Sequence, residues 1–328
     1  MDKTTTQIAP KSVILKAEDP IVLECGDTLR NVKISYTTFG KLNKEKTNVV
    51  WVFHALTANG NPAEWWSELV GHGKVINPES HFIVCANMLG SCYGSTGPLN
   101  SNFPLVTIND MVKAHQILKK HLGLNRIHLG IGGSMGGQQL LEWAVQEPDL
   151  FEHIVPLATN AFHSPWGIAF NEAQRMALEN IDSAKGLEAA RAIAMLSYRH
   201  YNTYHETQKD VDQRWDDYAA SSYQRYQGEK LRKRFSVHSY YSLSKAMDSH
   251  HLGRHFGSAE AALKRIRSKA LVIGIDSDIL FPPVEQKFIA EHIEGAKLKI
   301  IPSKFGHDGF LTEAELITEL LNDFLATA

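Results

Sequence analysis

Three residues that lie far apart in the chain have the types and the order that acyl transfer through a serine requires. Ser134 is the centre of a Gly-x-Ser-x-Gly pattern at residues 132–136, and Asp278 and His307 follow it. In this chemistry a serine attacks a carbonyl carbon, a histidine takes the serine proton, and a carboxylate orients the histidine. The three residues therefore predict a nucleophile, an acid and a base.

The surroundings of Ser134 strengthen this prediction. Residues 127–131 are an apolar run typical of a buried strand, and residues 135–146 carry apolar side chains at helical spacing. A sharp strand-to-helix turn strains the serine backbone and leaves no room for side chains at 132 and 136. The amide of Met135 at the helix start is then expected to form half of an oxyanion hole. The alternative is a glycine-rich turn in which the serine only caps the helix.

The acid and the base are expected on loops that follow later strands. The strand predicted at 270–275 leads directly into two aspartates, Asp276 and Asp278. We favour Asp278 because it lies further out on the loop, although either could simply cap the next turn. His307 stands between the last strand and the final helix. With sixteen histidines in the chain, only the order serine, acid, histidine distinguishes it.

The second half of the oxyanion hole is expected from the loop that follows the strand predicted at 48–53. This loop reads His-Ala-Leu-Thr-Ala-Asn over residues 54–59, and the amide of Leu56 is the predicted donor. The alternative is a plain connecting loop in which His54 makes local hydrogen bonds.

The elements around these residues predict an α/β-hydrolase fold with a mostly parallel central sheet. Apolar runs typical of buried strands alternate with helical patterns and occur at 48–53, 82–86, 127–131, 153–157, 270–275 and 298–301. Period-two alternation in the first forty residues, including 21–24 and 32–36, predicts an antiparallel hairpin at one edge. A capping box at 312–315, followed by an apolar stripe, predicts a C-terminal helix.

The composition changes over residues 162–266, which contain eight of the ten tyrosines. We interpret this stretch as a helical lid inserted between two strands of a core made by residues 1–161 and 267–328. The alternative is a surface subdomain with no part in the site.

Several classes of protein are excluded by composition. The net charge is −2 and no long basic run occurs, which argues against binding to nucleic acid or an anionic membrane. The chain shows neither the apolar region of a signal peptide nor a run of the ~18–20 apolar residues that a membrane span needs. The three cysteines fit a reducing cytoplasm, and no metal or dinucleotide motif is present.

Several segments together resemble the homoserine O-acetyltransferase family. They are His-Ala-Leu-Thr at 54–57, the segment 87–98, Gly-Gly-Ser-Met-Gly-Gly at 132–137 with Leu-Glu-Trp-Ala at 141–144, Leu-Ser-Tyr-Arg at 196–199, and the segments around Asp278 and His307. The resemblance spans residues 50–311 and implies a ping-pong reaction. Ser134 would take an acetyl group from acetyl-CoA, which enters as a substrate, and pass it to the hydroxyl of L-homoserine without a bound cofactor.

The resemblance also implies roles for individual residues. It assigns Ser134, Asp278 and His307 to the triad, Leu56 and Met135 to the oxyanion hole, Thr57 and Arg199 to the substrate carboxylate, and Asp308 to its ammonium group. It further implies a homodimer formed through the lid. Arg199 could instead form a salt bridge within the lid, and Asp308 could cap the last helix.

Departures from the family pattern concern substrate choice. This chain has His238 where the family usually has Asn, has Ala58 where a glycine usually follows the threonine, and is somewhat short. Transfer of succinyl, serine as acceptor, simple ester hydrolysis and a non-catalytic binding protein all remain alternatives. A single methylene in the acceptor is worth only about 1–3 kcal/mol of discrimination.

Overall fold

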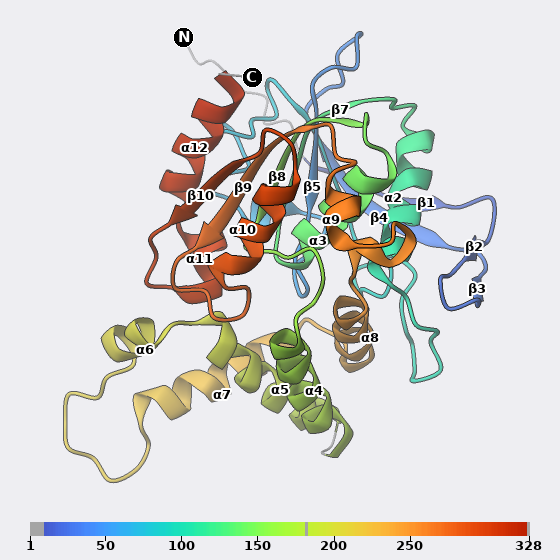
Figure 1. Ribbon diagram of the computed structural model, residues 1–328. Coiled ribbons are helices and arrows are strands. Elements are labelled where there is room, and N and C mark those ends of the chain that lie inside the picture. The colour runs from blue at the N-terminus through green and yellow to red at the C-terminus, as the bar shows by residue number, and fades with distance from the viewer. Residues whose placement is uncertain (1–9, 181–182, 327–328) are drawn as a thin grey trace, which may run out of the picture.

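One eight-stranded sheet organises the molecule (Figure 1), and the computed structural model describes residues 10–180 and 183–326. The strands follow the order β1 (Lys11–Lys16), β4 (Lys33–Phe39), β6 (Phe82–Ala86), β5 (Val49–Phe53), β7 (Ile127–Gly133), β8 (Phe151–Leu157), β9 (Lys269–Ile275) and β10 (Lys297–Ile301). The six strands from β6 to β10 are parallel, whereas β1 and β4 pair in antiparallel fashion at one edge. The predicted mostly parallel α/β-hydrolase sheet is confirmed.

The sheet is covered on both faces, which explains why its central strands are continuous apolar runs. All five residues of β5 are buried. Trp51 and Phe53 belong to one hydrophobic cluster, while Val50 and Val52 belong to the other. Because neighbouring side chains of a strand point to opposite faces, the two clusters are the two sides of the sheet.

Helices cover both faces of the sheet, and further helices make up the segment between β8 and β9. The first cluster includes residues of α2 (Ile108–His121), α3 (Met135–Gln146), α9 (Ala259–Leu263) and α10 (Pro283–His292), and the second includes residues of α11 (Gly309–Thr312) and α12 (Ala314–Ala326). Short helices lie at α1 (Pro62–Trp65), η1 (Leu252–His255) and η2 (Gly306–Asp308). None of the helices in the described ranges has the length and hydrophobicity needed to cross a bilayer.

The segment between β8 and β9 is helical, and most of it lies at one end of the sheet. It contains α4 (Pro165–Asn180), α5 (Ser183–Tyr198), α6 (Tyr201–Thr207), α7 (Ala219–Arg232) and α8 (Val237–Asp248). Figure 1 shows these five helices together below the sheet. In contrast, η1 and α9 contact α3 and so lie against the core.

Of two local predictions, the antiparallel edge is confirmed and the capping box was wrong. The edge hairpin forms, but β4 pairs with β1, whereas β2 (Ile21–Val22) pairs with β3 (Thr28–Leu29) in a separate small sheet. The chain turns back at once because the amide of Leu23 donates to the carbonyl of Asp27 at 2.8 Å and Gly26 adopts φ 94°. The capping box at 312–315 does not form, since the Thr312 hydroxyl donates to the carbonyl of Asp308 at 3.2 Å.

Candidate active site

The turn between β7 and α3 holds Ser134 in a strained conformation. Its backbone angles are φ 56° and ψ −128°, outside the regions that side chains other than glycine favour. Neighbouring groups stabilise this conformation: the Ser134 amide donates to the carbonyl of Leu157 at 2.9 Å, and the Thr159 hydroxyl donates to the Ser134 carbonyl at 2.8 Å. The strain is therefore maintained by buried hydrogen bonds from the end of β8.

The glycines on either side of Ser134 are required by close packing, as the sequence predicted. A Cβ atom at Gly136 would lie 2.2 Å from the carbonyl oxygen of Phe53, and one at Gly132 would lie 2.7 Å from the backbone of Gly136. Both contacts involve rigid backbone atoms, so larger residues would displace the turn.

His307 and Asp278 meet as a buried pair. Nδ1 of His307 lies 2.7 Å from Oδ2 of Asp278, and both residues are only 3% exposed. The other oxygen of Asp278 accepts hydrogen bonds from the amides of Leu280 and Phe281 at 2.8 and 2.9 Å. Asp276, the competing candidate, is exposed and accepts from the amide of Ser303 instead. The structure thus brings Asp278, and not Asp276, against the histidine.

The electrostatic environment of His307 favours its protonated form. Burial lowers the pKa of the imidazole, but the charge of Asp278 and its hydrogen bond outweigh burial. Asp308 and Glu285 add to the effect, and the pKa of His307 is raised above its ordinary value. An imidazole with this environment can accept a proton from a hydroxyl and stabilise the resulting cation.

The two predicted oxyanion amides are available beside the serine. Among the described residues, the amides of Leu56 and Met135 donate no hydrogen bond. The loop that carries Leu56 is fixed by His54, whose Nε2 accepts from the amide of Met88 at 3.1 Å and whose Nδ1 donates to the carbonyl of Ala55 at 2.9 Å. Burial lowers the pKa of His54 to about 4, so this imidazole stays neutral. The loop is therefore held in place by a buried residue.

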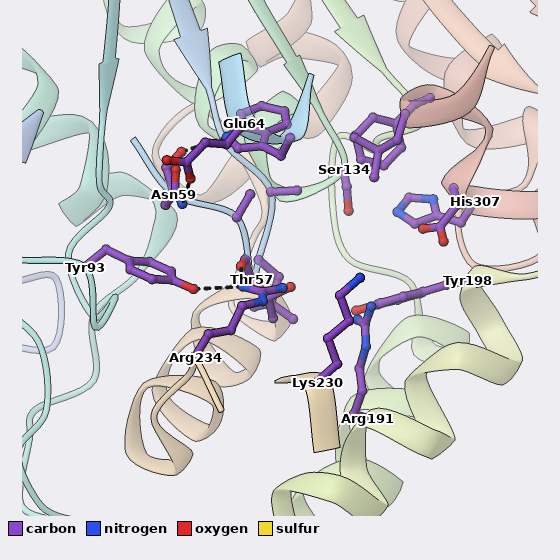
Figure 2. Close-up of a pocket in the computed structure, with 17 residues that line it drawn as sticks. Thr57, Asn59, Glu64, Tyr93, Ser134, Arg191, Tyr198, Lys230, Arg234 and His307 are labelled. Atoms are coloured by element: carbon purple, nitrogen blue, oxygen red, sulfur yellow. Dashed lines mark hydrogen bonds between the residues drawn. The ribbon is translucent and has the colours of Figure 1, made fainter. Parts of the chain in front are cut away.

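These groups open onto a cavity of about 380 Å³ between the sheet and the helices below it. Figure 2 shows the side chains of Ser134 and His307 facing each other at one end. Arg191 and Lys230 extend toward the same space from α5 and α7. Ser134 thus shares its cavity with cationic side chains, which suits a substrate that carries negative charge.

The three residues predicted to bind the substrate occupy different positions. Thr57 and Asp308 line the cavity, but Arg199 is not among the lining residues. Nε of Arg199 lies 2.9 Å from Oδ2 of Asp308. Burial raises the pKa of Asp308, while Arg199 and Arg191 partly oppose that shift. The carbonyl of Thr57 accepts a hydrogen bond from Arg234.

Comparison with known proteins identifies the family. The sequence profile of the alpha/beta hydrolase fold family matches residues 48–314. A curated homoserine O-acetyltransferase from Cyclobacterium marinum is 47% identical, and the match covers 95% of this chain and 94% of that protein. The chain belongs to the homoserine O-acetyltransferase family. A solved homoserine O-acetyltransferase from Staphylococcus aureus superimposes with a TM-score of 0.85 at 27% identity, covering 97% of this chain and 95% of that one.

The fold of this family is shared with hydrolases. The crystal structure of esterase E22 superimposes with a TM-score of 0.88 over 97% of this chain and all of that chain, although only 20% of residues are identical. At this identity the likeness concerns the fold alone. In this homoserine O-acetyltransferase family member, the features that decide between transfer and hydrolysis must therefore be sought in the side chains around the cavity.

Several lining residues were missed by sequence reasoning. The cavity wall includes Arg191, Tyr198, Lys230 and Arg234 from the helical segment, and Tyr93 from the core. Nη1 of Arg234 donates to the Tyr93 hydroxyl at 2.8 Å (Figure 2). A partial signal was present, because Arg191 and Tyr198 are seven residues apart and so share one face of a helix. Nothing in the sequence showed that this face meets the serine.

Proposed function

We propose that this protein transfers an acetyl group from acetyl-CoA to the hydroxyl of L-homoserine, a step of methionine biosynthesis. The observation that carries the proposal is the 47% identity to a curated homoserine O-acetyltransferase over 95% of the chain. The buried pair of His307 with Asp278, beside Ser134, supplies the chemistry that such a transfer needs.

The proposed reaction proceeds in two halves. Oγ of Ser134 attacks the thioester carbonyl while Nε2 of His307 takes its proton, and the amides of Leu56 and Met135 stabilise the oxyanion. The C–S bond breaks, and CoA leaves as the thiol with the proton from His307. The homoserine hydroxyl then attacks the acetyl-serine, His307 moves the proton from the hydroxyl to Ser134, and O-acetylhomoserine departs. Asp278 holds the imidazole orientation throughout, and no bound cofactor takes part.

The acceptor is proposed to bind through both of its charged ends. Asp308 faces the cavity beside His307 and suits the ammonium group. Arg199 with Thr57 would hold the carboxylate, since a guanidinium can bind a carboxylate through two hydrogen bonds. Because Arg199 pairs with Asp308, each residue also fixes the other, and acceptor binding would add a second pair of opposite charges to this one.

The central experiment follows release of free thiol from acetyl-CoA with and without L-homoserine. Release that requires homoserine and is lost in Ser134→Ala supports the proposal. Release that ignores homoserine points to a hydrolase. The same assay with succinyl-CoA and with L-serine decides between donors and between acceptors. No thiol from any combination would refute the proposed function.

The acceptor site can be tested with two arginine variants. Arg199→Met should raise the KM for homoserine by roughly 10–100-fold, the effect of losing a charge-assisted hydrogen bond of about 1.5–3 kcal/mol. Arg191→Met removes a cation that lines the cavity but is not assigned to the carboxylate, and it should raise that KM less than Arg199→Met does. If the two effects are reversed, Arg191, which lines the cavity, binds the carboxylate instead.

We further propose that residues 162–266 act as a lid on a core formed by residues 1–161 and 267–328, and that the protein is a cytoplasmic homodimer joined through this lid. Val211 and Trp215, in the α6–α7 connection, have almost fully exposed side chains. Exposed apolar side chains mark an interface where they form one contiguous patch, and these two residues lie only four positions apart. Sedimentation of the wild type and of Trp215→Asp tests the dimer, and two monomeric species would rule it out.

A further inference from the structure

A group of metal-ligand side chains lies at the end of the sheet opposite to Ser134. His128 is the second residue of β7, and Glu152 and His153 are the second and third residues of β8. Ser134 follows the other end of β7 directly. Since strands rise about 3.3 Å per residue, roughly 20 Å separates the two groups, so this cluster plays no part in the proposed acyl transfer.

The three side chains lie close enough to share one metal ion after a small movement of His153. One ligand atom from each of His128, Glu152 and His153 lies within 4.8 Å of the other two. Nδ1 of His128 is 3.1 Å from Oε2 of Glu152. In a tetrahedral zinc site with bonds of about 2.0–2.1 Å, neighbouring ligand atoms are about 3.3 Å apart. His128 and Glu152 already have about this separation. The ligand nitrogen of His153 must move toward the other two ligand atoms by at most about 1.5 Å to complete a set of three.

His153 has the hydrogen-bonding state of a metal ligand. It is only 2% exposed, and its Nδ1 lies 3.1 Å from the carbonyl oxygen of His128. When Nδ1–H donates to that carbonyl, Nε2 is unprotonated and carries a lone pair. This buried nitrogen has no hydrogen-bond partner among the described residues. Metal-binding histidines typically donate their second N–H to a carbonyl or carboxylate in this manner.

The charges around the cluster indicate which ions it can bind. Glu152 supplies the carboxylate oxygen of the cluster. Arg126 acts on Glu152, and Lys269 acts on His153, and both cations weaken attraction for a dication. Two imidazoles and one carboxylate favour zinc and similar transition metals over calcium or magnesium.

We propose that His128, Glu152 and His153 form a site for a divalent transition metal such as Zn²⁺, with solvent as a fourth ligand. The ion would connect β7 to β8 and fix the ring of His153, against which Phe324 of the C-terminal helix packs at 5.5 Å between ring centroids. Because an ion that binds only the folded chain stabilises it by mass action, zinc should also raise the melting temperature.

The test measures zinc binding to the whole protein by competition with a coloured chelator. His128→Gln and Glu152→Gln each remove one partly exposed ligand and should keep the fold, which circular dichroism verifies. The matched control is His72→Gln, because Nδ1 of His72 lies 3.3 Å from Oε1 of Glu79 in an exposed pair that has no third ligand within the described part of the chain.

We expect one zinc ion per chain in the wild type and in the control. Either ligand variant should weaken binding by at least about tenfold, the minimum loss seen even for residues that only support a ligand. Cobalt bound in place of zinc should give the visible absorption of a four-coordinate nitrogen and oxygen site. Absence of saturable binding, equal binding by the ligand variants, or loss in His72→Gln would each overturn the proposal.

Discussion

Replacement of Asp278 by asparagine should reverse the proton position on His307. In the structure one oxygen of Asp278 accepts from Nδ1 of His307 at 2.7 Å, and the other accepts from the amides of Leu280 and Phe281. In Asp278→Asn the side-chain oxygen has two backbone donors to satisfy, so the amide nitrogen must face the imidazole. It would donate to Nδ1, and the ring proton would then move to Nε2.

A histidine protonated on Nε2 cannot take a proton from the serine. We therefore expect the rate of acetyl transfer to fall roughly 10⁴-fold, the size of effect that a wrong tautomer causes in serine triads. The remaining activity should also move on the pH axis. As the pH is lowered, the wild-type rate should begin to fall while the pH is still above the ordinary pKa of histidine, because the pKa of His307 is raised. In the variant burial dominates, and this limb should shift to lower pH.

The assay is single-turnover thiol release from acetyl-CoA, measured across pH, with thermal melting to confirm that the variant is folded. Asp276→Asn is the matched control, since Asp276 is exposed two residues away, and it should leave the rate unchanged. A loss smaller than about 10²-fold in a folded Asp278→Asn protein, the lower range for general base catalysis, would refute the assigned role. So would equal losses in the two variants.

Three further predictions concern the buried histidines, the support of the Ser134 turn and the support of the Thr57 loop. Burial lowers the pKa values of His54, His115 and His163 to about 4 and that of His250 to about 3. Between pH 6.5 and 4 these histidines are therefore protonated in the unfolded chain but remain neutral in the folded chain. As the pH decreases through this range, the free energy of unfolding should decrease by about 1.4 kcal/mol per pH unit for each histidine. Urea unfolding measured across pH should show a smaller decrease per unit in His115→Gln. An unchanged slope in this variant would contradict the prediction. Thr159→Val removes one of three hydrogen bonds to the carbonyl of Ser134, since the amides of Gly137 and Gln138 still donate to it. This variant should lose about 0.5–1.5 kcal/mol of stability and have a lower kcat with an unchanged KM. Thr159→Ser should restore both, and wild-type kcat in the valine variant would contradict the role. Arg234→Met removes the hydrogen bond to the Thr57 carbonyl and should lower kcat, but by less than the roughly 10²–10³-fold lost with an oxyanion donor. The control is Arg232→Met, which breaks an exposed salt bridge and should leave kcat unchanged. Equal kcat values in the two variants would contradict the role of Arg234.

The parts of the site that the sequence predicted are those that depend on local patterns. Ser134 follows a strand and precedes a helix, and both elements have hydrophobic periods that are visible without a structure. The order of strands along the chain placed Asp278 and His307 at the correct edge, because parallel strands end on the same side of a sheet. Such features need no knowledge of long-range packing.

The predictions that were wrong or incomplete depended on contacts between distant segments. The capping box failed because the Thr312 hydroxyl found a partner in the preceding turn. The antiparallel edge was predicted, but the sequence did not show that residues 21–22 leave it and pair with β3 in a separate small sheet. Arg191 and Lys230 were not selected because charged residues are common on exposed helices, and only the docking of α5 and α7 places these two at the cavity.

The division between core and helices also bears on why such a scaffold would transfer an acetyl group instead of hydrolysing the ester. In the proposed mechanism the core supplies Ser134, His307 and the loop that carries Leu56, which water could use as readily as an acceptor alcohol. The helical segment supplies Arg191, Tyr198 and Lys230 to the same cavity. Binding energy used on an acceptor through such groups holds its hydroxyl at the acetyl-serine and displaces water from the attack position. Partition between transfer and hydrolysis is then a property of the helices, while the speed of acetylation is a property of the sheet.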